Sequence, residues 1–207
     1  MNVHKPMPPY VALPKGDVPF SLPSMAKTMK TRGKFLISTP TSYRPSEVEA
    51  RKTFGHLEID VVVSPCGEDK ACVVIVLERK THFYIAIHIP DHSATSILHA
   101  IKPLVKKYGK NCFRSITSDR GKEFNCFREV EAMDIPFYFA APYSSWQRGS
   151  NESSNGLLRE FYPKGTLFSN VSQEDLDKSV LLINEKPRKC LGFKTALEMF
   201  TKEISNL

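Results

Sequence analysis

Two aspartates have the positions that a divalent-metal site would require. Asp60 lies in the middle of the apolar run 57–63, and Asp119 follows the predicted strand 113–118. A lone buried aspartate is satisfied by an ion pair or by a place at the end of its strand, because an uncompensated buried charge costs several kcal/mol. Two aspartates at neighbouring parallel strand ends meet at one site, where they repel each other unless a cation lies between them. The pair therefore predicts a site for Mg²⁺ or Mn²⁺, which bind carboxylate and phosphate oxygens.

A third carboxylate, Glu152, begins a predicted helix over residues 151–162. At about 100° per residue, Asn155 and Arg159 fall on the same face of that helix as Glu152, and the apolar residues fall on the opposite face. An ordinary amphipathic surface helix would show the same division. The helix is therefore a candidate for the site only in combination with its neighbours in the sequence.

The loop before this helix, residues 141–150, holds the only tryptophan of the chain. Trp146 stands beside Gln147 and Arg148. An aromatic ring can stack on a base, and an arginine can bind a phosphate, so such groups at the rim of a metal site suit a nucleic-acid strand. This loop favours a functional helix at 151–162 over a merely solvated one.

Hydrophobic periodicity predicts the elements that would position these groups. Alternating and continuous apolar runs predict strands, and apolar residues three or four apart predict helices. The order predicts an α/β fold with a mixed five-stranded sheet flanked by helices. Capping boxes are expected at Ser172 with Asp175 and at Thr195 with Glu198, whereas Arg79 and Lys80 are expected at the surface. The predicted strands are 57–63, 71–77, 83–89, 113–118 and 136–140, and the predicted helices are 94–108, 124–133, 151–162, 172–185 and one from 195.

The N-terminal quarter of the chain has a different composition. Residues 1–55 hold nine Lys or Arg against three acids, within a chain of net charge +7, and eight of the fifteen prolines. We therefore predict an extended, basic, Pro-rich arm over residues 1–53 and a folded domain over residues 54–207. Such an arm suits salt-dependent binding of a polyanion, although a solvated tail would have the same composition. The cations proposed for phosphate binding are Lys27, Lys30, Arg32 and Lys34.

Composition also excludes several classes of protein. The sequence has no apolar run of the roughly 18 residues that a membrane span needs and no apolar stretch typical of a signal peptide near its start. The five cysteines form no Cys-x-x-Cys pair, which argues against a disulfide framework and a structural zinc site. These features predict a soluble protein of the reducing cytoplasm, without a membrane partner.

Five strings of the sequence resemble the catalytic half of transposases of the insertion-sequence-thirty family, in the same order. The resemblance implies an RNase H-like integrase fold in which Asp60, Asp119 and Glu152 form a DDE triad. It also implies two divalent metal ions, Mg²⁺ or Mn²⁺, with Asp60 shared between them. The strings are GHLEIDVVV at 55–63, LERKTHF at 77–83, TSDRGKEF at 117–124, PYSSWQRGSNESSNGLLREFYPKGT at 142–166 and INEKPRKCLGFKTALEMF at 183–200.

The same resemblance implies an activity and its partners. The expected reaction is metal-dependent DNA cleavage followed by 3′-hydroxyl strand transfer at insertion-sequence ends. The expected partners are terminal inverted repeats, target DNA and further copies of the chain assembled on DNA, at the nucleoid of a bacterial cytoplasm. DNA contacts are expected from Trp146, Gln147, Arg148, Asn155, Arg159, Lys164 and the basic arm.

Two other functions remain open at this point. Relatives carry an N-terminal helix-turn-helix region, and residues 1–53 do not resemble one. The chain could therefore be a truncated or catalytically silent DNA-binding remnant, or the downstream half of a frameshifted gene. An RNase H-type hydrolase of RNA–DNA hybrids would share the fold and the metals, but the segment from Trp146 to Gly156 resembles transposases.

Overall fold

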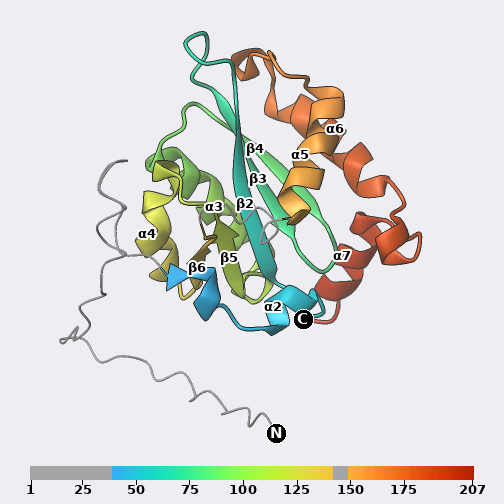
Figure 1. Cartoon of the computed structure of the whole chain (residues 1–207). Coiled ribbons are helices and arrows are strands. Elements are labelled where there is room, and N and C mark those ends of the chain that lie inside the picture. The colour runs from blue at the N-terminus through green and yellow to red at the C-terminus, as the bar shows by residue number, and fades with distance from the viewer. Residues whose placement is uncertain (1–38, 142–148) are drawn as a thin grey trace, which may run out of the picture. The chain divides into compact units, whose positions relative to one another are not determined.

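The computed structural model describes residues 39–141 and 149–207, without the side chains of residues 149–154. Within these residues, six strands form one mixed sheet in the order β1-β6-β5-β2-β3-β4. Helices lie against the sheet in front and behind (Figure 1). The strands are β1 (Thr39–Pro40), β2 (His56–Val63), β3 (Cys72–Glu78), β4 (Tyr84–Ile89), β5 (Ser115–Ser118) and β6 (Phe137–Phe139). The helices are α2 (Glu47–Ala50), α3 (Ala94–Tyr108), α4 (Phe127–Glu131), α5 (Gly149–Phe161), α6 (Gln173–Glu185) and α7 (Ala196–Ile204), with 3-10 turns that include η4 (Lys122–Cys126), η6 (Phe168–Asn170) and η7 (Lys189–Leu191).

The sheet combines an antiparallel meander with parallel strands. β2, β3 and β4 pair antiparallel in sequence order, and β5 returns through α3 to pair parallel with β2. β6 then pairs parallel with β5, and β1 pairs parallel with β6. The predicted mixed α/β sheet with flanking helices is confirmed, and it has one strand more than the five expected.

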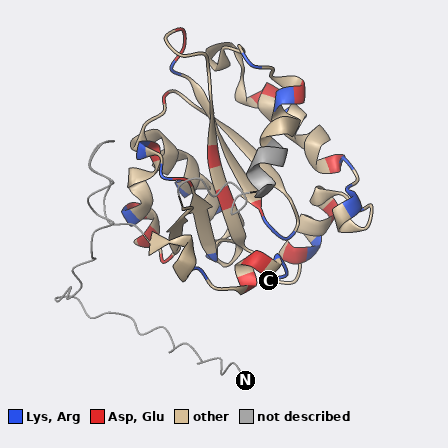
Figure 2. Ribbon diagram, viewed as in Figure 1, with Lys and Arg blue, Asp and Glu red and all other residues tan. Residues whose placement is uncertain are grey.

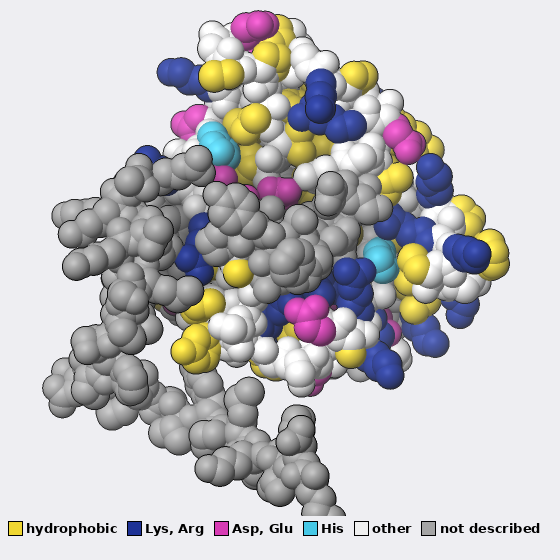
Figure 3. All heavy atoms as spheres, in the orientation of Figure 1, with side chains coloured by type: hydrophobic (Ala, Val, Ile, Leu, Met, Phe, Trp, Pro, Cys, Tyr) yellow, Lys and Arg dark blue, Asp and Glu magenta, His cyan; other side chains and the backbone are white. Residues whose placement is uncertain are grey.

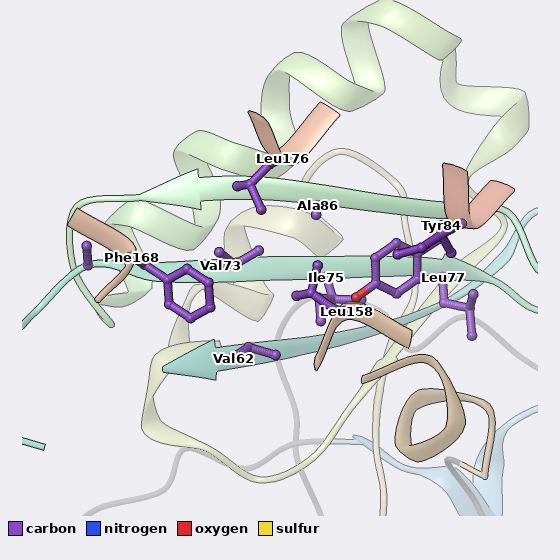
Figure 4. Close-up of a cluster of buried hydrophobic side chains, with 11 residues drawn as sticks. Val62, Val73, Ile75, Leu77, Tyr84, Ala86, Leu158, Phe168 and Leu176 are labelled. Atoms are coloured by element: carbon purple, nitrogen blue, oxygen red, sulfur yellow. The ribbon is translucent and has the colours of Figure 1, made fainter. Parts of the chain in front are cut away.

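Two apolar layers hold helices against the sheet. On one face, Val62, Ile75 and Tyr84 pack with Leu158 of α5 and Leu176 of α6, as the close-up shows (Figure 4). On the other face, the buried residues of α3 include Ile97, Ala100, Ile101 and Leu104, and α3 runs without interruption through Pro103. The face under α5 and α6 is the one that includes Asp60, because Asp60 and Val62 are two residues apart on β2 and so point the same way.

Residues 39–53, which the sequence analysis placed in the extended arm, contain packed elements. β1 adds a sixth strand to the sheet, and Val48 of α2 is buried with 1% of its surface exposed. The Arg44 guanidinium is also buried, and it donates to Thr117 Oγ1 at 3.0 Å. The structure differs here from the expected arm because a two-residue strand and a four-residue helix carry no periodicity that a sequence could reveal.

Arg79 is a correction to the sequence analysis, which placed it at the surface. Its side chain is 2% exposed, and it contacts the fully buried Glu58 through an ion pair. Arg79 Nε also donates to the Val48 carbonyl at 3.2 Å, and Nη2 lies 3.6 Å from Glu49. The arginine therefore ties α2 to the sheet. Its partner Glu58 lies on β2, two residues before Asp60. Lys80 is partly exposed, as expected, and pairs with Glu203 at 2.7 Å.

Of the two expected capping boxes, the one at Thr195 is confirmed, whereas α6 has the cap by the Ser172 side chain without the reciprocal bond to the Ser172 amide. Thr195 accepts a hydrogen bond from the Glu198 amide at 3.0 Å, and Glu198 accepts one from the Thr195 amide at 2.8 Å. Ser172 accepts from the Asp175 amide at 3.1 Å, while its hydroxyl donates to the Asp175 carboxylate at 2.7 Å. These caps fix the first turns of α7 and α6.

Two amide side chains of α6 bind the outer edge of β4. Asn184 accepts from the Tyr84 amide at 2.9 Å and donates to the Tyr84 carbonyl at 2.8 Å. Gln173 donates to the Ala86 carbonyl at 3.0 Å and accepts from the His88 amide at 2.8 Å. These bonds satisfy backbone groups that the edge of a sheet would otherwise leave open.

We expect Asn184→Ala to lower the free energy of unfolding by about 2–6 kcal/mol, because it leaves two buried backbone groups of Tyr84 unsatisfied at about 1–3 kcal/mol each. Urea unfolding measures the loss. Gln173→Ala is the matched control, because it removes the same kind of bond at a more exposed position and should cost less. If both variants lose the same free energy of unfolding, the burial of Asn184 does not determine the size of the loss.

Candidate active site

Asp60 and Asp119 both follow the paired stretch of two neighbouring strands. β2 and β5 pair in parallel as far as Glu58 opposite Thr117; Asp60 lies two residues further along β2, and Asp119 comes directly after the end of β5. Neighbouring strands are about 4.8 Å apart, so paired side chains lie on the same face and close together. Both residues are half-buried, and acidic positions stand out within the otherwise uncharged centre of the sheet in Figure 2. The fold thus places the two aspartates that the sequence analysis singled out on neighbouring segments of the sheet, β2 and the end of β5.

Hydrogen bonds orient each of the two carboxylates. Asp60 Oδ1 accepts from the Val61 amide at 3.0 Å, and Asp60 Oδ2 accepts from Asn155 Nδ2 at 2.9 Å. Asp119 Oδ1 accepts from the Gly121 amide at 3.0 Å, in the turn that follows β5. The bond from Asn155 joins α5 directly to the aspartate on the central strand.

The bond from Asn155 also bears on the position of Glu152. Glu152 lies on α5 three residues before Asn155, which is about 60° around the helix axis and 4.5 Å along it. That spacing puts the two residues on neighbouring positions of one helix face. The side chain of Glu152 itself lies outside the described residues.

Of the residues predicted to contact DNA, the structure describes the surroundings of Arg159 and Lys164 but not of those in the preceding loop and the N-terminal arm. Arg159 Nη1 donates to the carbonyls of Tyr162 at 3.3 Å and Pro163 at 3.2 Å, so its guanidinium closes the end of α5. Lys164 follows this end and is exposed. Trp146, Gln147, Arg148, Lys27, Lys30, Arg32 and Lys34 lie outside the described residues.

Tyr84 is a neighbour of the site that the sequence analysis missed. Its ring is fully buried beside Leu158, and its hydroxyl oxygen points toward that residue (Figure 4). Burial, and to a smaller extent the charge of Asp60, raises the pKa of Tyr84 far above its usual value, so the phenol stays protonated. Its position on β4, in alternation with Ala86, marks an inward-facing side chain, which is the one signal that the sequence offered.

The donor atoms around Asp60 fit a hard divalent cation. The two aspartates supply carboxylate oxygens, and Asn155 Oδ1 and Tyr84 Oη are buried without a hydrogen-bond partner among the described residues. Oxygen ligands with room for water are what Mg²⁺ and Mn²⁺ prefer. Within the described side chains, no group of three or more His, Cys, Asp or Glu residues converges as a metal site. A complete ligand set therefore needs a further group in addition to the aspartate pair.

Comparisons with known proteins agree with this fold. Residues 50–145 match the family model described as the integrase core domain. A probable transposase for the insertion-like sequence element IS1161 of Streptococcus salivarius is 36% identical over 157 residues, which are 76% of this chain and 44% of that protein. Transposase InsI for insertion sequence element IS30A of Escherichia coli strain K12 is 30% identical over 168 residues, 81% of this chain and 43% of that protein.

A solved structure supports the fold independently. The catalytic core domain of BIV integrase superposes with a TM-score of 0.57 at 17% identity, covering 74% of this chain and 98% of that one. This agreement confirms the RNase H-like architecture of the sheet. Among the described residues, no helix has the length and apolar character needed to cross a membrane.

The match to the transposases covers only part of each relative. This chain spans less than half the length of the two transposases described above. The similarity nevertheless covers most of the chain, and residues 50–145, which match the integrase core domain, include both aspartates of the candidate site. The chain therefore carries a match to the integrase core domain, and over most of its length it is similar to transposases of insertion sequences such as IS30A.

Proposed function

We propose that this chain is the catalytic core of a DNA transposase that cuts DNA and joins the freed 3′-hydroxyl to a second site. The observation that carries the proposal is the bond from Asn155 of α5 to Asp60 on β2, beside the parallel neighbour β5, which ends directly before Asp119. Such an arrangement presents carboxylates on one rigid surface, where a phosphodiester and its cations can be held in a fixed geometry.

The reaction consists of two displacements at phosphorus. In the first, the oxygen of a water molecule attacks a phosphodiester, the bond from phosphorus to the 3′-oxygen breaks, and a 3′-hydroxyl is released. In the second, that hydroxyl attacks another phosphodiester and displaces one strand end. Asp60, Asp119 and Glu152 would hold divalent cations, which would supply charge stabilisation to the attacking and leaving oxygens.

The protein's own residues have mainly positioning roles in this scheme. Asp60 and Asp119 would hold the cations, and Glu152 would complete the ligand set from α5. Asn155 fixes the carboxylate of Asp60 through its 2.9 Å bond, which limits the rotation of that side chain. Trp146, Gln147, Arg148 and Lys164 contact the DNA strand, and the full reaction takes place in an assembly of several copies on DNA.

Metal-dependent nicking tests this proposal. With Mg²⁺ or Mn²⁺, the parent chain should nick and join a duplex that carries an insertion-sequence end, and chelator should stop both steps. Glu152→Gln removes one proposed ligand and should reduce nicking to background. Glu160→Gln neutralises an exposed carboxylate on the same helix, which pairs with Lys186 at 3.5 Å, and should leave nicking unchanged.

The outcomes separate the proposal from its alternatives. DNA binding by the parent chain without any nicking is what a catalytically silent remnant would give, and it would overturn the proposed activity. Hydrolysis of RNA–DNA hybrids in preference to duplex DNA would favour an RNase H-type enzyme. Equal activity in the two variants would remove Glu152 from the site.

A further inference from the structure

The segment that joins α6 to α7 presents cations and an aromatic ring to solvent. Residues 186–197 contain four Lys or Arg and no acid. Lys186 pairs with Glu160, but Lys189 and Lys194 are exposed and form no ion pair with a residue that the structure describes. Phe193, between these two lysines in the loop, is 74% exposed. Uncompensated cations around an exposed ring are typical of a surface that binds a polyanion with bases or sugars.

This loop is held in one conformation by its own backbone. The Arg188 amide donates to the Lys194 carbonyl at 3.0 Å, and the Phe193 amide donates to the Arg188 carbonyl at 3.0 Å. Arg188 Nη2 also reaches the Ile183 carbonyl at the end of α6, at 3.4 Å. The exposed ring is therefore presented at a fixed place, which lowers the entropy lost on binding.

Phe193 holds a backbone conformation that opposes folding. Its φ of 66° lies in the left-handed region, which a bulky residue other than glycine adopts only at a cost in energy. The ring gains little in return, because most of it faces solvent. A strained residue with an exposed ring is better explained by a contact with a partner than by the stability of the fold.

The turn between β3 and β4 lies close to the loop, because His82 Nε2 is 4.0 Å from Cys190 Sγ. Burial first, and then the charges of Arg188, Arg51 and Arg79, lower the pKa of His82 to about 4, so its ring is neutral. In Figure 3, Lys and Arg side chains gather beside α6 and α7, in the view that has α5 in front of the sheet.

We propose that residues 188–194 bind duplex DNA that extends from the candidate active site. Lys189 and Lys194 contact phosphates of the backbone, and Phe193 packs against a deoxyribose or an opened base step. DNA fits better than an acidic protein because a duplex offers regularly spaced phosphates together with apolar sugar and base surfaces. This inference rests on the proposed function, since it assigns a further contact for the same substrate.

Salt dependence tests the two lysines. Binding of the full chain to a short fluorescent duplex is measured by anisotropy in chelator, over a range of salt concentrations. Lys189→Ala with Lys194→Ala should reduce the slope of log affinity against log salt by about 1.8, because each lost phosphate contact contributes about 0.9. Lys102→Ala with Lys106→Ala is the matched control, since both are exposed lysines of α3, and it should leave the slope unchanged.

Asparagine at position 193 tests the ring. Asparagine tolerates the left-handed region, so Phe193→Asn should melt at the same temperature as the parent or higher. The same variant should bind duplex DNA about fivefold or more weakly, with an unchanged salt slope, because stacking and apolar contacts carry no counterion term. A merely structural ring would give the opposite pair of results, a lower melting temperature and full affinity.

The results also distinguish this inference from the proposed function. Equal salt slopes for the loop pair and the α3 pair, or full affinity in Phe193→Asn, would overturn the DNA contact even if the parent nicks DNA. If the variants change the oligomeric state but not the affinity for DNA, the loop forms a contact between copies of the chain. That result would also overturn the DNA contact. No duplex binding by the parent would remove both proposals. If the parent binds duplex DNA without nicking it and the loop variants bind the duplex more weakly, the DNA contact of the loop is supported and the proposed nicking activity is not.

Discussion

Asp60→Asn should abolish metal-dependent nicking and joining while the chain melts in chelator at the same temperature as the parent or higher. The substitution keeps the volume of the side chain and removes one of the two carboxylate charges that follow the paired stretch of β2 and β5. Like charges repel each other when no cation lies between them, and solvent reduces this effect because both groups are half-buried. The variant should also lose the rise in melting temperature that Mg²⁺ or Mn²⁺ gives the parent.

The surroundings of Asp60 allow this substitution to fold. Asn155 Nδ2 donates to Asp60 Oδ2 at 2.9 Å, and Asn155 Oδ1 has no partner among the described residues. If its amide turns over, Asn155 can accept a hydrogen bond from the new amide at position 60. Asp134→Asn is a matched control, because Asp134 is an exposed acid paired with Lys110 at 2.7 Å and should not affect nicking. A variant that melts much lower in chelator and still nicks DNA would show that Asp60 is a structural residue.

Arg79→Met should lower the free energy of unfolding by about 3–5 kcal/mol, which is the usual cost of removing one partner of a buried ion pair. The guanidinium is 2% exposed and Glu58 is fully buried, so the loss leaves a desolvated carboxylate without the cation that contacts it. The same substitution removes the bond from Arg79 Nε to the Val48 carbonyl, which fastens α2. Urea unfolding measures the change.

Two further variants show whether the charge or the packing is responsible. Lys80→Met removes the neighbouring, partly exposed cation and should cost about 1 kcal/mol or less, in the range of surface ion pairs. Arg79→Met combined with Glu58→Leu removes both buried charges and should recover much of the loss. If the double variant is as unstable as Arg79→Met alone, the packing of α2 rather than the buried charge determines the stability.

The parts of the fold that the sequence predicted are those with a strong local pattern. β2, β3 and β4 were predicted because apolar residues dominate each run, and α3 because its apolar residues repeat at helical spacing. β1 is only two residues long and contains Pro40, so no pattern distinguished it from a loop. Its pairing with β6 depends on residues almost a hundred positions away.

The candidate site shows the same limit. The shared helix face of Glu152 and Asn155 could be predicted from spacing, and Asn155 indeed bonds to Asp60. A charged residue such as Arg79 was expected at the surface because its partner, Glu58, lies on another strand and is invisible to a local pattern. Tyr84 was missed for a similar reason, since its proximity to Asp60 arises only when the sheet and α5 are assembled.

The amides of α6 on the outer edge of β4 have a consequence for how copies of this chain can associate. An open sheet edge invites another chain to add a strand, which is a common route to aggregation and to sheets that continue across subunits. Gln173 and Asn184 already occupy the backbone groups of Tyr84, Ala86 and His88 that such a strand would need. Copies that meet on this side must therefore recognise each other through helix side chains, which a sequence can vary without disturbing the catalytic sheet.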